Sequence, residues 1–148
     1  MKMRAFESGV VAELQAAAGH MEREHNMELA GKERFEMDDL MEIIRLLRRP
    51  VGGCPWDSVQ THQSIRMNFL EETCEVLEAI DLADSTLLCE ELGDILMQVA
   101  LHTAMEEEQG RFTLEDVCTG VCRKLIYRHP HVFAGKAAPG PSTWDELK

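Results

Sequence analysis

Two short acidic clusters contain the residue types in this chain that could bind a metal ion. EETCE at residues 71–75 contains Glu71, Glu72 and Glu75, and EELGD at residues 90–94 contains Glu91 and Asp94. Residues three apart on a helix lie on one face, where like charges repel. No Lys or Arg lies within residues 72–110, so the local sequence offers no basic partner. Buried carboxylates would then need a shared proton or a divalent cation. Carboxylate oxygens suit Mg²⁺, for which Mn²⁺ should substitute.

Two helices joined by a tight turn must position these carboxylates. Apolar periodicity predicts one helix over about 61–82 and another over about 86–108, with ADS between them. The second segment is apolar around most of its circumference, which is typical of a buried helix. Its polar residues fall within one narrow wedge: Glu91, Asp94, Gln98 and His102. Glu91 and Asp94 are therefore expected to point into the bundle rather than into open solvent. His102 is interpreted as a hydrogen-bonded polar residue of that helix, because the histidines form no credible zinc site.

The antiparallel pairing of these helices predicts which carboxylates meet. In a hairpin centred on residue 83, Glu72 lies level with Asp94, and Glu75 lies level with Glu91. We therefore expect four carboxylates at one height between the two helices. The alternative is a solvated acidic face, as most charged runs are. Glu78 and the Glu106–Glu108 run are interpreted as surface charge of that kind.

The whole chain reads as an all-α protein. The loop RRPVGGCP separates the first core helix from the second, and residues that favour helix N-termini precede three helices: Asp57-x-x-Gln60, Asp84 or Ser85, and Thr113-x-x-Asp116. We predict a four-helix-type bundle with helices over about 36–48, 61–82, 86–108 and 113–127. An N-terminal helical extension (1–35) precedes the predicted domain (36–133), and a flexible tail ending in WDELK (134–148) follows it.

Composition narrows the class of protein. The 148 residues, 45% apolar and 28% charged, are sufficient for one globular domain. No apolar run is long enough to span a membrane, and the N-terminus lacks a signal peptide, so we expect a cytoplasmic protein. A net charge of −12 argues against binding a nucleic acid polymer. Five cysteines without a CxxC pair indicate reduced thiols in core positions, among them Cys74, Cys118 and Cys122.

Several segments together resemble one known family. The EETCE and EELGD clusters are similar to the EExxE…ExxD signature of the all-α nucleoside triphosphate pyrophosphohydrolases. GGCPWDSVQTH, FLEETCEVLEAI, EELGDILMQV, EEEQGRFTLEDV and KLIYRHPHVF resemble segments of its MazG branch, in the same order. The resemblance covers residues 36–133 and extends to WDELK. Many MazG proteins contain two such domains, whereas this chain contains one, and Cys74 replaces an aromatic residue of many relatives.

The resemblance implies an enzyme that hydrolyses NTPs or dNTPs between the α- and β-phosphates, yielding a nucleoside monophosphate and pyrophosphate, as house-cleaning of the nucleotide pool. It also implies Mg²⁺ dependence and a homodimer or higher oligomer. Carried over by position, the metal ligands are Glu72, Glu75, Glu91 and Asp94. Glu71 and Glu72 form the catalytic pair, with Glu71 as the candidate general base.

Basic and aromatic residues near the C-terminus are the candidates for substrate contact. Lys124 and Arg128, four apart on the last helix, share a face and repel without an anion between them. Unaided, this pattern is as compatible with solubilisation, but the resemblance favours phosphate binding. It also indicates that Trp144 contacts the base or sugar, unless the tail is disordered. Two alternatives stay open: a narrower dNTP pyrophosphatase for dUTP, dCTP or a modified dNTP, and a non-catalytic nucleotide-binding helical module.

Overall fold

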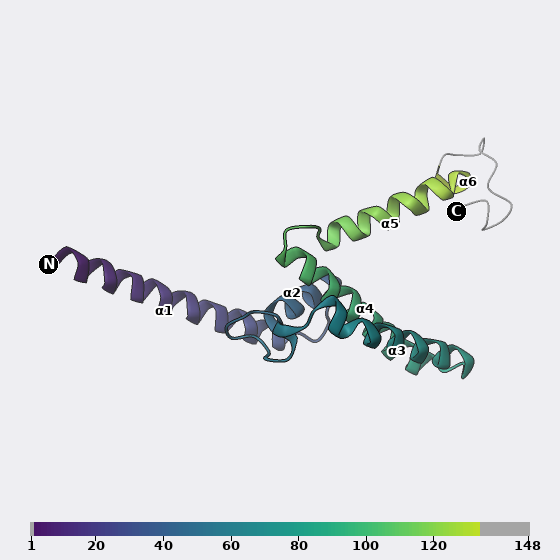
Figure 1. Cartoon of the computed structure of the whole chain (residues 1–148), viewed down its shortest axis with the longest axis horizontal. Helices are drawn as coiled ribbons and strands as arrows, with labels where there is room; N and C mark the ends of the chain where they lie inside the picture. Colours follow the sequence, from purple (N-terminus) through teal and green to yellow (C-terminus); the bar gives the residue numbers. More distant parts are fainter. Residues whose placement is uncertain (1, 134–148) are drawn as a thin grey trace. The chain divides into compact units, whose positions relative to one another are not determined.

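The computed structural model describes residues 2–133, with side chains from residue 15 onward, and this part is entirely helical (Figure 1). It divides into two compact units, Met1–Leu40 and Met41–Lys148, which we describe separately. The absence of strands in the described residues agrees with the all-α prediction. The elements are α1 (Lys2–Ala30), α2 (Met37–Leu47), the short 3₁₀ helix η1 (Asp57–Val59), α3 (His62–Asp81), α4 (Ser85–Glu108), α5 (Leu114–Arg128) and α6 (Pro130–Phe133). None of the helices in this range is long and apolar enough to cross a membrane.

The first unit consists of the predicted N-terminal helix and the start of α2. Beyond α1, the Lys32 ammonium donates to the Asp39 carboxylate at 2.6 Å, and the Glu36 backbone N–H donates to the same side chain at 2.8 Å. Asp38 and Asp39 lie in the first turn of α2, where negative charge is favourable near the exposed N–H groups. These contacts define where α2 begins.

The second unit is built around the hairpin of α3 and α4. Thr61 caps α3 in a capping box with Ser64, so the predicted box at Asp57 and Gln60 is wrong. Asp57 instead starts η1. At the other end, the Asp84 carboxylate accepts from the N–H groups of Thr86 and Leu87, which confirms it as the N-cap of α4. A turn this short holds the helices antiparallel and side by side.

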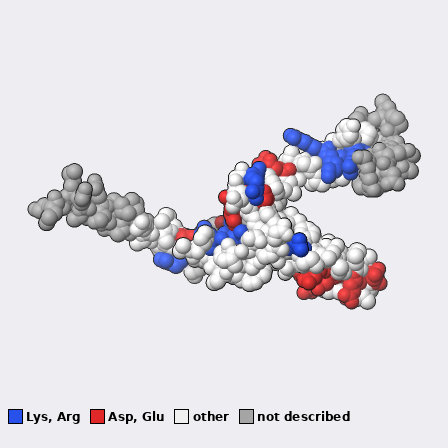
Figure 2. Space-filling model, in the orientation of Figure 1, with Lys and Arg blue, Asp and Glu red and all other residues white. Residues whose placement is uncertain are grey.

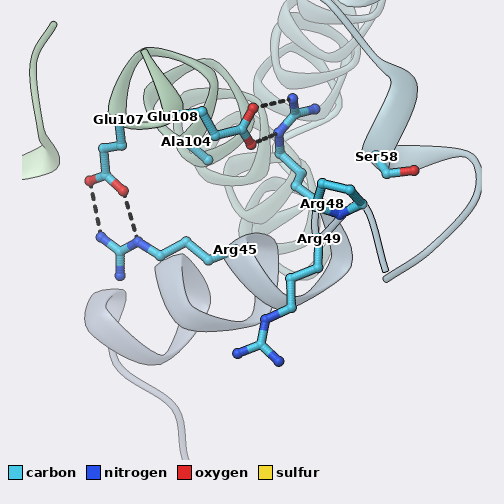
Figure 3. Close-up of a pocket in the computed structure, with 8 residues that line it drawn as sticks. Arg45, Arg48, Arg49, Ser58, Ala104, Glu107 and Glu108 are labelled. Carbon is cyan, nitrogen blue, oxygen red and sulfur yellow. Dashed lines mark hydrogen bonds and ion pairs between the residues drawn. The ribbon is translucent and has the colours of Figure 1, made fainter. Parts of the chain in front are cut away.

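Arginines of the α2 end fasten the loop before α3 to the end of α4 (Figure 3). Arg48 is 7% exposed and binds Glu108 through two hydrogen bonds of 2.6 and 2.9 Å. Its remaining N–H groups donate to the carbonyls of Asp57 and Gln60. Arg45 makes a similar two-bond contact with Glu107. The Glu106–Glu108 run is therefore not simple surface charge as predicted, because its members hold arginines brought close by the fold.

The apolar core of the described residues is small, and large apolar side chains remain exposed. Leu92 and Leu96 on α4 are about half exposed, contrary to the expectation of a helix buried on all sides. The cysteines are also mostly outside the core: Cys74, Cys89, Cys118 and Cys122 are exposed, and only Cys54 is partly covered. Among the described elements α5 packs closely only with α6, so the closed four-helix bundle stays a prediction. The buried apolar side chains of the second unit are Met41, Ile44, Ile65, Ala79, Ala100, Leu101, Ala104 and Met105.

Candidate metal and active site

The hairpin brings three of the predicted carboxylates together. Glu72 on α3 and Glu91 and Asp94 on α4 each offer an oxygen, and these atoms all lie within 4.8 Å of one another. Glu91 is buried and the other two are half-buried. Figure 2 shows acidic side chains gathered over the turn end of the α3–α4 hairpin. The wedge of polar residues on α4 thus points toward α3, as its position on an otherwise apolar helix indicates.

The electrostatics follow the pairing predicted from the hairpin. Burial raises the pKa of Glu91, and the neighbouring charge of Glu75 and a hydrogen bond to it raise the pKa further. Burial likewise raises the pKa of Glu72, and the largest charge contribution comes from Asp94. The charge of Glu75 therefore raises the pKa of Glu91, and the charge of Asp94 raises the pKa of Glu72. Without a cation, the cluster is a set of acids that resist ionising together.

One buried carboxylate oxygen in this cluster lacks a hydrogen-bond partner. The Oε2 atom of Glu91 is buried and has no hydrogen-bond partner among the described residues. A buried carboxylate oxygen without a partner costs free energy unless it binds a proton or a cation. With three carboxylates in reach and no basic side chain nearby in sequence, the donor set is entirely oxygen. This composition fits a hard divalent cation such as Mg²⁺.

Comparison with known proteins identifies the family that this site belongs to. Residues 60–133 match the model of the MazG nucleotide pyrophosphohydrolase domain, which covers half of the chain and includes the whole carboxylate cluster. The chain belongs to the MazG family. Its α3–α4 hairpin lies within the matched MazG segment.

Curated relatives of this MazG chain include named enzymes. The nucleoside triphosphate pyrophosphohydrolase of Escherichia coli K12 is 44% identical over 117 residues, which cover 76% of this chain and 44% of that protein. The nucleoside triphosphate pyrophosphohydrolase/pyrophosphatase MazG of Thermotoga maritima is 42% identical over 111 residues, covering 75% and 43%. The uncharacterized protein YabN of Bacillus subtilis is 51% identical over 117 residues, covering 76% and 24%. The chain spans less than half the length of these relatives.

Two other predicted site residues of this MazG domain, Glu75 and Glu71, lie outside the cluster of mutually close carboxylate oxygens. Glu75 lies outside the cluster of mutually close oxygens but within hydrogen-bonding reach of Glu91. Glu71 is exposed beside Glu72 on α3. Their roles, like those of the clustered carboxylates, stay predictions.

The predicted substrate contacts lie on α5 and beyond it. Figure 2 shows basic side chains over α5, the helix that contains Lys124 and Arg128. Because α5 does not pack closely on the hairpin among the described elements, the structure does not bring these two residues to the carboxylates. Trp144 lies outside the described residues. The assignment of these three residues stays a prediction.

Two details of the predicted polar wedge on α4 were not anticipated. The Oε1 atom of Gln98, one turn beyond Asp94, is buried without a partner among the described residues. Further along α4, His102 faces His62 across the interface. The pair could have been found from sequence, since the two histidines are equally far from residue 82, close to the centre of the hairpin.

Proposed function

We propose that this MazG domain hydrolyses nucleoside triphosphates to a nucleoside monophosphate and pyrophosphate in an Mg²⁺-dependent reaction. The observation that carries the proposal is the carboxylate cluster, in which the buried Oε2 of Glu91 has no partner. Two of the relatives are named nucleoside triphosphate pyrophosphohydrolases and cover three quarters of this chain. In the cell, this reaction would remove unwanted nucleotides from the nucleotide pool, which is a house-cleaning role.

The carboxylates would hold the metal, and the chain's other groups would position substrate and water. Glu72, Glu91 and Asp94 are the nearest ligands, with Glu75 close enough to Glu91 to join them. Mg²⁺ in this position would neutralise phosphate oxygens and lower the pKa of a bound water, and Mn²⁺ would substitute. The exposed carboxylate of Glu71 would accept the proton of the attacking water.

The active protein would be a homodimer or higher oligomer. Both hairpin helices and α5 expose large apolar side chains that a second copy would cover. A bundle closed by that copy could also bring an α5 to the hairpin, placing Lys124 and Arg128 near the phosphates. The exposed large hydrophobic side chains on these helices are Met67, Leu70, Leu77, Ile80, Leu92, Leu96, Val117, Val121, Leu125, Ile126 and Tyr127.

The reaction is tested by incubating the protein with each of the eight common NTPs and dNTPs plus Mg²⁺ and identifying the products. We expect monophosphate and pyrophosphate, and Glu91→Gln should lose the activity. Glu78→Gln is the matched control, because Glu78 lies on the same helix as Glu72 but outside the cluster. Release of orthophosphate alone, or full activity in Glu91→Gln, would overturn the proposal.

The same assay separates the remaining alternatives. A narrow dNTP pyrophosphatase would turn over dUTP, dCTP or a modified dNTP and leave the other nucleotides intact. A non-catalytic module would bind nucleotide in saturating Mg²⁺ without releasing product. The buried Oε2 atom of Glu91, which has no hydrogen-bond partner among the described residues, counts against the latter, since an interaction helix gains nothing from a buried acid.

A further inference from the structure

Two histidines meet at the end of the hairpin opposite the carboxylates. His62 is the first residue of α3, and its Nδ1 lies 2.6 Å from Nδ1 of His102 on α4. The ring planes differ by 4° and the ring centroids are 5.0 Å apart, so the nitrogen of one ring can donate along the plane of the other. Phe69 contacts His102 at a centroid distance of 5.9 Å. This pair has no part in the proposed nucleotide chemistry.

The partners of His62 determine where its proton lies. Its Nε2 atom is 2.6 Å from Oε1 of Glu106, whose pKa is lowered to about 2 by Arg111 and by His62 itself. Glu106 is therefore an ionised acceptor, and the Nε2 atom of His62 must carry a hydrogen. In the neutral pair, Nδ1 of His62 is then the acceptor and Nδ1 of His102 is the donor.

This arrangement tolerates one added proton but not two. With one added proton, a single N–H still lies between the rings, whichever ring bears the charge. With two, an N–H of each cationic ring faces the other at 2.6 Å, and the hydrogen bond is lost. We propose that His62 and His102 form an acid-sensitive latch between the start of α3 and the C-terminal half of α4. The latch is closed while the pair holds at most one added proton and opens when both rings are protonated.

The charges around the pair come from three other places in the unit. Glu106 on α4 lies 2.6 Å from Nε2 of His62 and also accepts from Arg111 in the following loop. On the far side, Arg48 and Glu108 line a cavity of about 160 Å³ together with His62, and they neutralise each other. Burial and the neighbouring His62 lower the pKa of His102. No further anion faces the pair in the described residues to stabilise a second positive charge.

The latch predicts the direction of the pH effect. In the unfolded chain each histidine takes up a proton near its ordinary pKa of about 6.5. The closed pair accommodates one proton fewer, because the 2.6 Å contact between the Nδ1 atoms has room for only one hydrogen, and burial lowers the pKa of His102 in the same direction. The stability that the pair contributes is therefore complete above this pH and is lost as the pH falls below it. Linkage for one proton raises the unfolding equilibrium constant by up to about tenfold per pH unit in that range.

Ring-nitrogen NMR of the full chain tests the latch directly. Across a pH titration, we expect His62 to keep a hydrogen on Nε2 and His102 to take up its proton below about pH 6.5. The NMR chemical shifts of residues in α3 near His62 should change when His102 is protonated. Two rings that titrate independently, with His102 at or above its ordinary pKa, would overturn the latch.

Unfolding experiments provide the second test. As the pH falls from about 7 to about 5, the unfolding constant should rise more in the wild type than in His102→Asn, and this difference isolates the pair because the carboxylate cluster contributes alike to both proteins. His20→Asn is the matched control, because His20 is exposed on α1 and pairs only with Glu24 among the contacts described. An unchanged slope in His102→Asn would contradict the proposal, and ring titration of the wild type decides if the variant fails to fold. Neither result depends on nucleotide hydrolysis.

Discussion

Glu91 on α4 lies within hydrogen-bonding reach of Glu75 on α3, across the interface of the hairpin. Two carboxylates can share a hydrogen bond only if one of them carries a proton. Burial and the neighbouring charge of Glu75 raise the pKa of Glu91, so this carboxyl holds a proton more readily than an isolated glutamate does. A cation that binds the cluster competes with protons for the same oxygens. Metal binding, protonation and folding are consequently linked at one site.

The first prediction concerns stability without metal. The ordinary pKa of Glu72 and Glu91 is 4.5, and both values are raised in the folded chain. The folded state therefore binds these protons more tightly than the unfolded state, and its stability falls as the pH rises above 4.5 through the raised values. Thermal unfolding in a chelator should show this loss. Mg²⁺ at 100 times its dissociation constant should add about 2.7 kcal/mol at neutral pH.

Glu91→Gln gives a second, sharper prediction. Without metal at neutral pH, the variant should be more stable than the wild type, because a buried acid is replaced by a neutral side chain. With saturating Mg²⁺ the order should reverse, and activity should fall by about 100-fold or more. Thermal unfolding with and without Mg²⁺ measures both effects, and Glu78→Gln serves as the control. A variant stabilised by Mg²⁺ as strongly as the wild type would remove Glu91 from the metal site.

The carboxylate pairing could be predicted because it depends on local rules. Helix periodicity places Glu72 and Glu75 on one face, and a short turn fixes how the two helices lie beside each other. The observed neighbours are those expected from equal distances to residue 83. Local N-cap preferences likewise predicted Asp84 or Ser85 as the N-cap of α4, and the structure shows Asp84.

The parts that could not be predicted depend on contacts distant in sequence. Nothing near Glu108 indicates that Arg48 will meet it, since the loop between α2 and α3 determines that approach. The exposure of Leu92 and Cys74 has a related cause. An apolar pattern indicates that a face will be covered, but it does not indicate whether the same chain or another copy covers it.

Arg48 carries a prediction about the loop before α3. Arg48→Lys removes the two-bond contact with Glu108 and leaves the carbonyls of Asp57 and Gln60 without this donor. Arg48 is buried, but the Glu108 side chain is 43% exposed and lysine keeps the positive charge, so the lost hydrogen bonds should cost about 1.5–3 kcal/mol. Arg45→Lys is the matched control: the Arg45 side chain is 52% exposed, and such pairs contribute about 1 kcal/mol or less. Urea unfolding should separate the two variants, and equal losses would contradict a structural role specific to Arg48.

A substitution in the hairpin turn is predicted to stabilise the chain, in contrast to Arg48→Lys. Ala83 has a φ of 53°, in the left-handed region that costs a residue with a side chain about 1–2 kcal/mol. Ala83→Gly should relieve this cost and stabilise the chain by about 1 kcal/mol, after the greater freedom of glycine in the unfolded chain is included. Ala100→Gly, in the interior of α4, should destabilise it by about 1 kcal/mol or more. Chemical unfolding measures both, and a destabilising Ala83→Gly would contradict strain at this turn.

The acid limit of stability depends on Glu106. Arg111 contributes most to lowering the pKa of Glu106 from 4.5 to about 2, followed by His62. A lowered pKa means that the contribution of Glu106 is complete above pH 4.5 and is lost as the pH falls toward about 2. Arg111→Gln should raise the Glu106 pKa and move the midpoint of acid unfolding to higher pH. Arg66→Gln makes the same charge change at an exposed position whose described contact is Gln63. If both variants shift the midpoint equally, net charge rather than the Arg111–Glu106 contact sets the acid limit.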